Sequence, residues 1–286
     1  MAITRLGVVG CGLMGSGIAE VGARAGLDTL VLELDQAALD SGRHRIETSL
    51  ARAVKAAKLS GEDRAAALSR LRFTTDATAL GDRQLVVEAV IESEAEKLEV
   101  FQTIDKVVVD DDAILASNTS SIPIMKLAMA TRRPGQVVGL HFFNPVPVLR
   151  LVELVTSLLT APETAEKAEQ FATSLLGKRV IRSQDRAGFV VNSLLVPYIL
   201  SAIRMYESGF ATRDDIDAGM VEGCAHPMGP LALADLIGLD TTAAIAQSLY
   251  AEFKEPTYAA PATLNRMVEA GLLGRKTGRG FYDYSR

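Results

Sequence analysis

Cysteine is scarce in this chain of 286 residues, in which only Cys11 and Cys224 occur, far apart in the sequence. Two distant cysteines can build neither a disulfide framework nor a zinc cluster. We therefore expect no metal site, and a reducing cytoplasm is the location that this composition favours.

Long apolar runs are missing as well, and none approaches the length that a bilayer-spanning helix needs. The first five residues lack the basic start, apolar stretch and cleavage site of a signal peptide and lead straight into a strand-like segment. The formal net charge is −5, which argues against general nucleic-acid binding. We expect neither a membrane nor a nucleic acid as partner. The length allows one large domain or two ordinary ones.

Short apolar runs alternate with a helical pattern in the first part of the chain. Strands are expected at residues 6–9, 29–32, 85–87, 113–115 and 137–140, and a helix at 13–25. Nearly continuous apolar runs favour parallel strands buried on both faces, and their alternation with helices favours a doubly wound α/β sheet. Residues 37–71, broken only near 60–61, predict a helical hairpin inserted between strands.

The pattern changes after about residue 184. Helices are expected near residues 192–208, 213–220, 231–251 and 261–270, with weak strand signals. The sequence therefore predicts two domains. Residues 1–186 form the doubly wound α/β domain with the inserted hairpin, and residues 187–286 form an all-α domain.

A glycine-rich segment follows the first expected strand and opens the first expected helix. The residues Gly10-Cys11-Gly12-Leu13-Met14-Gly15 fit the dinucleotide-binding pattern G-x-G-x-x-G in the structural context that this pattern requires. Gly10 allows the tight turn, Gly12 lets the backbone approach a pyrophosphate, and Gly15 lets the helix pack on the sheet. The helix N-terminus, at Leu13 and Met14, attracts phosphate. The motif predicts that residues 1–186 are a Rossmann-type dinucleotide-binding domain. The alternative is a plain turn between strand and helix.

An acidic residue after the second strand should bind the ribose hydroxyls of the cofactor. Glu33 and Asp35 both have suitable spacing, but Asp35 precedes a helical segment and is expected to cap it. We therefore assign the ribose contact to Glu33. A carboxylate there repels a 2′-phosphate, and the nearest downstream cation, Arg43, is some way off. NAD is the expected cofactor, and NADP stays possible.

Only three histidines occur, and His141 stands apart from His44 in a charged helix and His226 in a turn. It lies at the carboxyl end of the expected strand 137–140, where open α/β sheets bind ligands. Twelve residues later, Glu153 lies within an apolar run, where an unpaired carboxylate is costly to bury. A His–Glu pair could fix one ring nitrogen and leave the other for proton transfer. A structural ion pair, or an exposed Glu153, is the alternative.

Further motifs follow in a fixed order: SGIA at 16–19, ASNTSS at 116–121, GLHFFNPVP at 139–147, GFVVN at 188–192, HPMGP at 226–230 and KTGRGFY at 276–282. Together with the glycine loop they resemble the L-3-hydroxyacyl-CoA dehydrogenase family, in particular its 3-hydroxybutyryl-CoA branch, over nearly the whole chain. The resemblance implies reversible NAD-dependent oxidation of an (S)-3-hydroxyacyl-CoA to a 3-ketoacyl-CoA in fatty-acid or butyrate metabolism. It also implies a homodimer built through the helical domain.

The resemblance assigns residue roles as well. It makes His141 the catalytic base and Glu153 its partner, and it places Ser120 and Asn192 at substrate and nicotinamide. It assigns Glu92, Lys97, Ser120 and Lys276 to the cofactor site, and Ser49, Ser120, Asn144 and Asn192 to the CoA substrate. Plain alternatives exist, because Ser120 and Asn192 could cap helices, and Glu92 and Lys97 could be ordinary charges on a helix face.

The CoA phosphates have no obvious partner, because a lysine that some relatives use falls at Ala56. The expected inserted helix is basic, with Arg43, Arg45, Arg52, Lys55 and Lys58 against Glu47 over residues 43–58. We interpret this helix, and Lys55 in particular, as a docking surface for CoA. A solvated helix face is the rival interpretation.

Two other functions stay open at this point. A β-hydroxyacid dehydrogenase acting on a free acid shares such a cofactor domain, but the His141 motif disfavours its lysine-based chemistry. A non-catalytic, crystallin-like nucleotide-binding relative is the second alternative. It is disfavoured because His141, Glu153, Ser120 and Asn192 occur together.

Overall fold

A computed structural model describes residues 3–285. The chain divides into two compact units, Met1–Arg186 and Ala187–Arg286. Among residues 3–285, no helix is both long enough and apolar enough to cross a bilayer.

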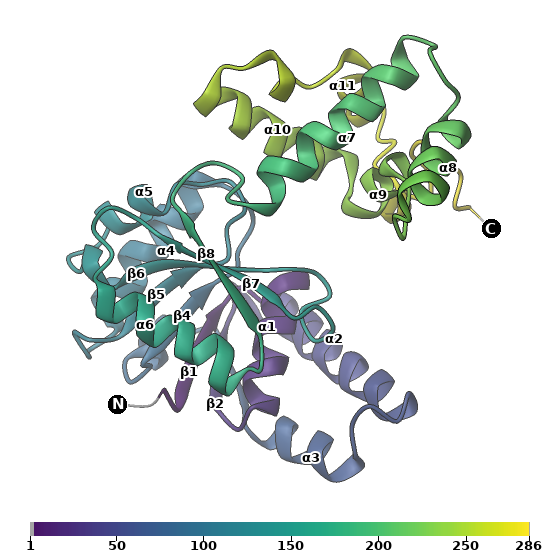
Figure 1. Cartoon of the computed structure of the whole chain (residues 1–286). Helices are drawn as coiled ribbons and strands as arrows, with labels where there is room; N and C mark the ends of the chain where they lie inside the picture. The colour runs from purple at the N-terminus through teal and green to yellow at the C-terminus, as the bar shows by residue number, and fades with distance from the viewer. Residues whose placement is uncertain (1–2, 286) are drawn as a thin grey trace. The chain divides into compact units, whose positions relative to one another are not determined.

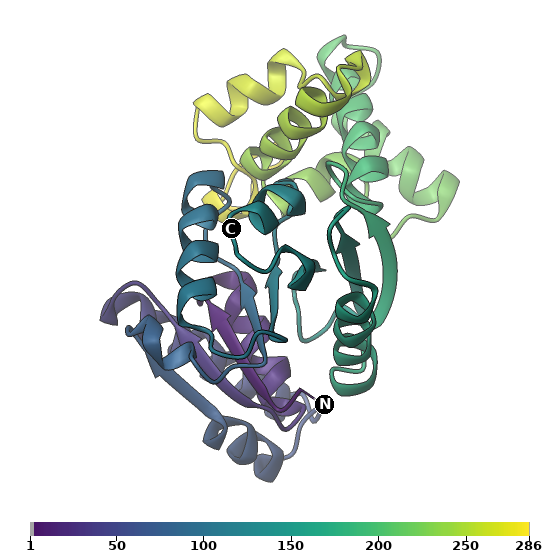
Figure 2. The same ribbon diagram turned by 90° about the vertical axis from the view of Figure 1, so that its left-hand side faces the viewer.

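The first unit is built on an eight-stranded sheet with the strand order β3-β2-β1-β4-β5-β6-β7-β8. In Figure 2 it runs from β3, in blue, at one edge to β8, in green, at the other. Strands β1 to β6 are parallel, β7 pairs antiparallel with β6, and β8 runs parallel to β7. The bounds are β1 Arg5–Val9, β2 Asp28–Leu32, β3 Leu71–Thr74, β4 Leu85–Glu88, β5 Ile114–Ser117, β6 Val137–Phe142, β7 Leu151–Thr156 and β8 Arg179–Gln184.

Helices cover both faces of this sheet, as Figure 1 shows. Helices α1 (Leu13–Arg24) and α6 (Pro162–Gln170) with its continuation η3 (Phe171–Leu175) share one apolar core with the strands. Helices α4 (Glu94–Val107) and α5 (Ile124–Met129) lie behind the sheet in that view. Every residue of β4, β5 and β6 is buried, as the continuous apolar runs predicted. The doubly wound α/β fold is confirmed.

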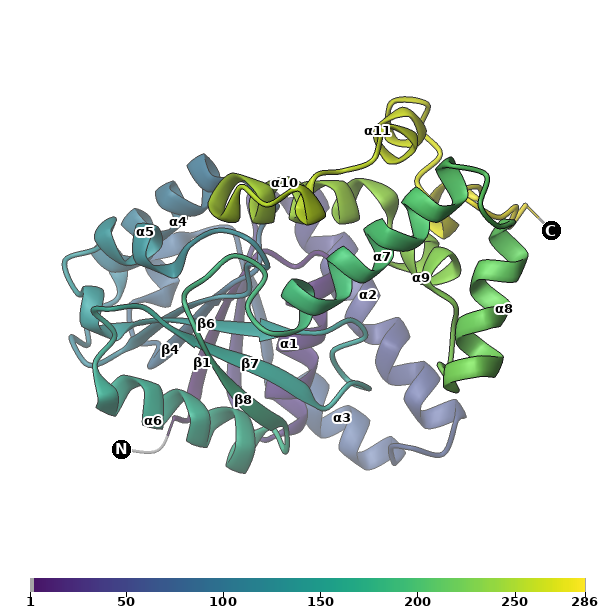
Figure 3. The same cartoon turned by 45° about the horizontal axis from the view of Figure 1, so that its top comes forward.

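The inserted hairpin is confirmed as α2 (Gln36–Lys55) and α3 (Gly61–Ser69), which lie beside α1 (Figures 1 and 3). Asp35 caps α2 by accepting from the Ala38 amide, and Ser60 caps α3 by accepting from the Asp63 amide. Each cap satisfies an amide that the first helical turn leaves unpaired.

The second unit is helical, with α7 (Val191–Glu207), α8 (Arg213–Cys224), α9 (Pro230–Ile237), α10 (Leu239–Phe253) and α11 (Ala262–Glu269). One prediction for this unit is wrong, because the single helix expected at 231–251 is two helices. Gly238 separates them with φ +104°, a backbone conformation that a right-handed helix cannot contain.

Candidate active site

The glycine loop follows β1, where the strand order reverses, because β2 and β4 lie on opposite sides of β1. Gly10 has φ +88°, and a Cβ there would lie 2.8 Å from the carbonyl oxygen of Ala89. A Cβ on Gly15 would lie 1.8 Å from the carbonyl oxygen of Gly10, whereas a Cβ on Gly12 would meet nothing within 4 Å. No side chain caps the N-terminus of α1. This open helix N-terminus fits a dinucleotide pyrophosphate.

Two charged side chains hold the backbone of Cys11 within this loop. Glu33 Oε1 accepts a short hydrogen bond from the Cys11 amide, and Arg45 Nη1 donates to the Cys11 carbonyl at 2.7 Å. Arg43, the cation considered from the sequence, is instead stacked over the ring of Phe73. Arg45, and not Arg43, is therefore the arginine of α2 that contacts the loop. The sequence did not predict this contact, because nothing in the residues around Arg45 indicates that its side chain reaches the glycine loop.

Exposed apolar side chains border the same edge of the sheet. Leu13 follows β1, Leu34 follows β2 and Ile91 follows β4, and all three are largely exposed. Exposed leucine and isoleucine side chains at the carboxyl ends of parallel strands suit the flat faces of a nucleotide base. Leu34 and Ile91 were not predicted, although apolar residues placed just beyond buried strands are a usable signal.

Glu92 and Lys97 belong to one polar network, in which Lys97 and Glu88 are buried and Glu92 reaches the surface. Lys97 Nζ lies 2.6 Å from Glu88 Oε1 and 3.2 Å from Glu92 Oε2, and its side chain is almost fully buried. Ser117 Oγ donates to the second oxygen of Glu88 at 2.6 Å. Lys97 is thus no ordinary surface charge; its position lets it neutralise the carboxylates of Glu88, at the end of β4, and Glu92, in the segment that follows β4.

The carboxylate of Glu92 shapes the segment that contains Ser120. Glu92 Oε1 accepts from the Ser120 amide at 2.9 Å and from the Ser121 amide at 3.1 Å, and from Thr119 Oγ1 at 2.5 Å. Burial alone would raise the pKa of Glu92, but the charge of Lys97 and these hydrogen bonds hold it below its usual value. Glu92 therefore stays ionised and fixes the backbone at Ser120.

His141 and Glu153 lie on the antiparallel strands β6 and β7, where they face each other in register. His141 Nδ1 lies 2.6 Å from Glu153 Oε2, and both side chains are buried. The ring of Phe143 packs against the imidazole, with 4.6 Å between the ring centroids. The predicted pair therefore exists, and the alternative of an exposed Glu153 is wrong. The carboxylate orients the ring and is placed to stabilise an imidazolium.

The remaining predicted residues are spread over both units. Ser49 lies on α2 near Glu20, Lys55 is exposed at the end of α2, and Asn144 is exposed in the loop after β6. In the second unit, Asn192 lies in the first turn of α7, and Lys276 Nζ contacts the carboxylate of Asp240 at 2.5 Å.

The helix-capping alternatives for Ser120 and Asn192 are wrong. Helix α5 begins at Ile124, and its first amides donate to Asp185 at 2.7 Å, so Asp185 and not Ser120 caps this helix. The N-cap of α7 is Val190, and Asn192 lies inside the helix.

The chain matches two family models that together span most of its length. Residues 5–186 match the NAD-binding domain of 3-hydroxyacyl-CoA dehydrogenase, and residues 188–284 match its C-terminal domain. This chain belongs to the 3-hydroxyacyl-CoA dehydrogenase family.

Named relatives agree with this assignment. A 3-hydroxybutyryl-CoA dehydrogenase of Mycobacterium tuberculosis is 61% identical over 283 residues, 99% of each chain. The crystal structure of M. tuberculosis FadB2 matches this 3-hydroxyacyl-CoA dehydrogenase with a TM-score of 0.98 at 60% identity, covering 99% of this chain and 100% of the other. The (S)-3-hydroxybutyryl-CoA dehydrogenase PaaH1 of Ralstonia eutropha matches with a TM-score of 0.95 at 44% identity, covering 100% of both chains.

Proposed function

We propose that this dehydrogenase catalyses the reversible NAD-dependent oxidation of (S)-3-hydroxybutyryl-CoA to acetoacetyl-CoA. The single observation that carries the proposal is the buried His141–Glu153 pair at the carboxyl end of β6. The matches to both family models and the names of the full-length relatives support the substrate class.

The imidazole of His141 supplies the proton transfer. A bound NAD⁺ supplies the chemistry of a hydride acceptor for C3 of the substrate. In oxidation His141 acts as the general base and takes the proton of the substrate 3-hydroxyl. In reduction protonated His141 acts as the general acid and gives its proton to the developing alkoxide. Imidazole suits both directions because its reference pKa of about 6.5 lies near working pH. Glu153 fixes the ring and stabilises the protonated form.

Other residues bind and orient the two ligands. Gly10, Gly12, Leu13, Met14 and Gly15 hold the pyrophosphate and Glu33 the ribose, while Ser120 and Asn192 hydrogen-bond the reacting substrate. Lys276 and Ser120 contact the cofactor, and Glu92 and Lys97 act by holding the segment at Ser120. Ser49, Lys55 and Asn144 contact the CoA substrate. Such positioning supplies a large share of the barrier reduction in two-substrate reactions.

The assembly is a homodimer joined through the helical second unit. Phe210 and Leu194 are largely exposed there, and Leu236 is half-exposed. Large exposed apolar side chains are typical of protein interfaces. The enzyme works in the reducing cytoplasm, which suits its two free cysteines.

Acetoacetyl-CoA-dependent consumption of NADH tests the proposal directly. The wild-type protein consumes NADH with acetoacetyl-CoA and not with free acetoacetate, and a C4 to C16 series of 3-ketoacyl-CoA substrates defines its chain-length preference. His141→Gln lowers kcat by about 10² or more, because general acid–base catalysis contributes that much. NADH consumption with the free acid alone, or no turnover at all, would favour one of the two rival functions. A near-normal kcat in His141→Gln would contradict the assignment of His141 as the catalytic acid and base.

A further inference from the structure

Strand β6 is longer than the ladder that joins it to β5. The last pair of that ladder is Ser117 with Gly139, whereas β6 continues through His141 to Phe142. On its other side this last part of β6 pairs with β7. His141 therefore lies where β5 no longer accompanies β6, and the backbone groups on the open side of the strand need another partner.

The side chain of Asn118 supplies such a partner. Asn118 directly follows β5, and its Oδ1 accepts from the backbone N–H of Phe142 at 2.9 Å. This N–H belongs to the peptide group that joins His141 to Phe142. Because a backbone N–H only donates, the contact also fixes which end of the carboxamide faces β6. A side chain thus takes the place of the missing strand next to the catalytic residue.

The backbone of Asn118 is itself bound to the neighbouring strand. Its N–H donates to the carbonyl oxygen of Glu88, the last residue of β4, at 2.9 Å. Asn118 therefore connects the ends of three strands. It continues β5 along the chain, it contacts β4 through its N–H, and it contacts β6 through its carboxamide.

The residues on either side of Asn118 are also held in place. Ser117 Oγ donates to Glu88 Oε2 at 2.6 Å and accepts from the Thr119 N–H at 3.1 Å. Both Ser117 and Thr119 are buried, and Thr119 Oγ1 accepts from the N–H of Ile122 at 2.9 Å. The backbone that carries the Asn118 side chain is therefore rigid enough for the carboxamide to position the peptide group that it binds.

Ser120 lies on the same segment, two residues after Asn118. Its N–H donates to the carboxylate of Glu92 at 2.9 Å, so its backbone is fixed as well. Ser120 follows β5 and His141 lies near the end of β6, and the ladder between these two strands ends before either residue. The Asn118 side chain is hence a direct link between the segment of Ser120 and the peptide group of His141.

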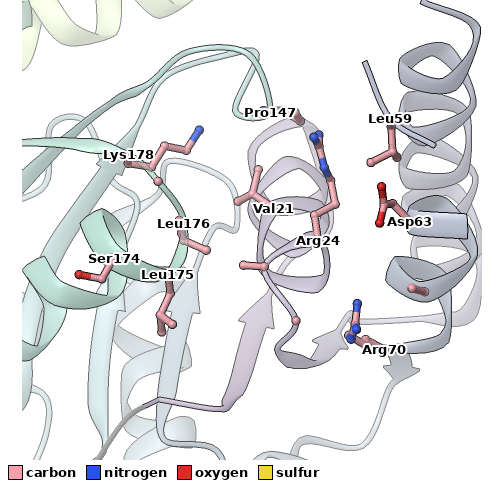
Figure 4. A pocket seen from close by; sticks show the side chains of 14 residues that line it. Val21, Arg24, Leu59, Asp63, Arg70, Pro147, Ser174, Leu175, Leu176 and Lys178 are labelled. Carbon is pink, nitrogen blue, oxygen red and sulfur yellow. The ribbon is translucent and has the colours of Figure 1, made fainter. Parts of the chain in front are cut away.

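The loop that follows β6 has a second anchor at its far end. Lys178 Nζ donates to the carbonyl oxygens of Val146 and, at 2.7 Å, of Leu149. Figure 4 shows this lysine in the lining of a cavity that also includes Arg24 and Arg70. The loop is thus held at both ends, and the contact with Asn118 is the one that lies next to His141 in the chain.

We propose that Asn118 is a positioning residue, which sets the distance between Ser120 and the imidazole of His141 through its hydrogen bond with the Phe142 N–H. The proposal rests on the proposed function, in which Ser120 and His141 both act on the reacting end of the substrate. A misplacement of about 1 Å in such a site can cost about 100-fold in rate. Turnover therefore depends on the acceptor oxygen of residue 118 more strongly than cofactor binding does.

Two other roles for Asn118 compete with this one. In a purely structural role, Asn118 would satisfy the N–H of the buried Phe142, and its loss would lower stability without a specific effect on turnover. In a ligand-binding role, Asn118 would act through Nδ2, for which residues 3–285 provide no acceptor. The three roles differ in which atom of the carboxamide matters and in which quantity changes.

The test compares two variants that nearly keep the size of the side chain. Asn118→Asp keeps an oxygen that accepts from the Phe142 N–H, Asn118→Leu removes it, and neither variant has the amide donors. We expect Asn118→Leu to lower kcat with acetoacetyl-CoA about tenfold or more, with KM for NADH within about twofold of the wild type. Asn118→Asp recovers most of this loss at its own pH optimum, because the added charge changes the titration of nearby groups. An unchanged kcat in Asn118→Leu overturns the proposal, and so does an equal loss in both variants, which would point to Nδ2.

Gln84→Met is the matched control for lost stability. The carboxamide of Gln84 accepts from the backbone N–H groups of Thr4 at 2.8 Å and Arg5 at 3.1 Å, at the opposite end of the same sheet. We expect a lower melting temperature in both Gln84→Met and Asn118→Leu, but a lower kcat in Asn118→Leu alone. An equal fall of kcat in the two variants would show that lost stability explains the effect and would overturn the proposal.

Hydrogen exchange followed by mass spectrometry tests the contact without turnover. We expect the Phe142 amide to exchange about tenfold faster or more in Asn118→Leu than in the wild type, and at nearly the wild-type rate in Asn118→Asp. Unchanged exchange at Phe142 in Asn118→Leu overturns the proposal. Failure of the wild type to reduce acetoacetyl-CoA, with exchange at Phe142 responding as expected, would instead count against the dehydrogenase function alone.

Discussion

His141 and Glu153 face each other across the one antiparallel pairing of the sheet, with 2.6 Å between Nδ1 and Oε2. The antiparallel turn of the chain at residues 143–150 is what makes them neighbours, because β7 runs back along β6 and fixes their register. A rigid pair of strands, rather than a loop, therefore positions the proton-transfer group.

Replacing Glu153 separates orientation from charge. Glutamine keeps the shape of the side chain and can still accept from Nδ1, but it cannot stabilise an imidazolium by charge. We expect Glu153→Gln to lower kcat about 10- to 100-fold, the loss typical of one hydrogen bond to a charged group, while the protein remains folded. Steady-state kinetics and circular dichroism check this. Glu169→Gln, which removes a carboxylate from a surface ion pair with Arg182, serves as the control. A fully active Glu153→Gln enzyme would reduce this residue to a structural one.

The glycine loop offers a second, paired prediction. A Cβ on Gly12 would meet open space, so we expect Gly12→Ala to have the melting temperature of the wild type in the absence of cofactor. The variant should bind NADH more weakly, because the methyl group occupies the approach of the pyrophosphate. A Cβ on Gly15 lies 1.8 Å from the Gly10 carbonyl, so that Gly15→Ala destabilises the protein even without cofactor. Thermal melts with and without NADH distinguish the two. Equal melting temperatures without cofactor would contradict the packing role of Gly15.

The sequence predicted what local patterns encode. The apolar runs predicted β1, β2, β4, β5 and β6, the glycine loop predicted the start of α1, and the apolar setting of Glu153 predicted its pairing. The strands β3, β7 and β8 were not predicted as strands. The exposed edge strand β8, Arg179–Gln184, mixes charged and apolar residues and has no continuous buried face. A strand of this kind gives a weak pattern.

Long-range contacts account for the other omissions. Lys97 lies on a helix and was open to interpretation as a surface charge, and only its approach to Glu88 and Glu92 accounts for its burial. Arg24, Arg70 and Lys178 are unremarkable where they occur in the sequence and meet only in the folded unit. Gly238 lies within a continuous apolar helical pattern, so that nothing local showed that its φ would be positive.

Asp105 gives the stability of the first unit a dependence on pH. Its buried carboxylate lies 2.9 Å from both Arg132 Nε and Arg133 Nε. Burial alone would raise the pKa of Asp105, but the hydrogen bonds from these arginines lower it on balance. A lowered pKa in the folded state means that the stabilisation is complete above the unfolded value of about 3.9 and is lost as the pH falls towards the folded value.

We therefore expect Asp105→Asn to lower the melting temperature at pH 7 by about 5 °C, because it removes the charge of a buried, paired carboxylate. The difference from the wild type should shrink as the pH falls below about 4. Asp111→Asn is the matched control, since its fully exposed carboxylate lies 3.8 Å from Arg133 and should contribute little. Scanning calorimetry from pH 7 to pH 3 measures these melting temperatures. A constant difference in melting temperature between Asp105→Asn and the wild type over this range would contradict the role of ionised Asp105.

Arg45 connects the inserted hairpin to the glycine loop, and we expect its replacement to weaken cofactor binding. The backbone of Cys11 is held at its N–H by Glu33 and at its carbonyl by Arg45. Arg45→Met keeps much of the side-chain volume but removes the donor, which frees the carbonyl and loosens the loop before the pyrophosphate binds. We expect KM for NADH to rise about tenfold, as for the loss of one charge-assisted hydrogen bond, with kcat retained at saturating NADH.

Arg43→Met is the control for this change, because it removes the same charge from the same helix but only a stacking contact with Phe73. If the hydrogen bond to Cys11 is what matters, Arg45→Met alone weakens NADH, and KM for the thioester stays unchanged in both variants. Because Glu33 is kept in both proteins and repels a 2′-phosphate, NADPH remains the poorer cofactor throughout. An equal rise in KM for NADH in both variants would show that the general positive charge of α2, rather than the anchor at Cys11, supports cofactor binding.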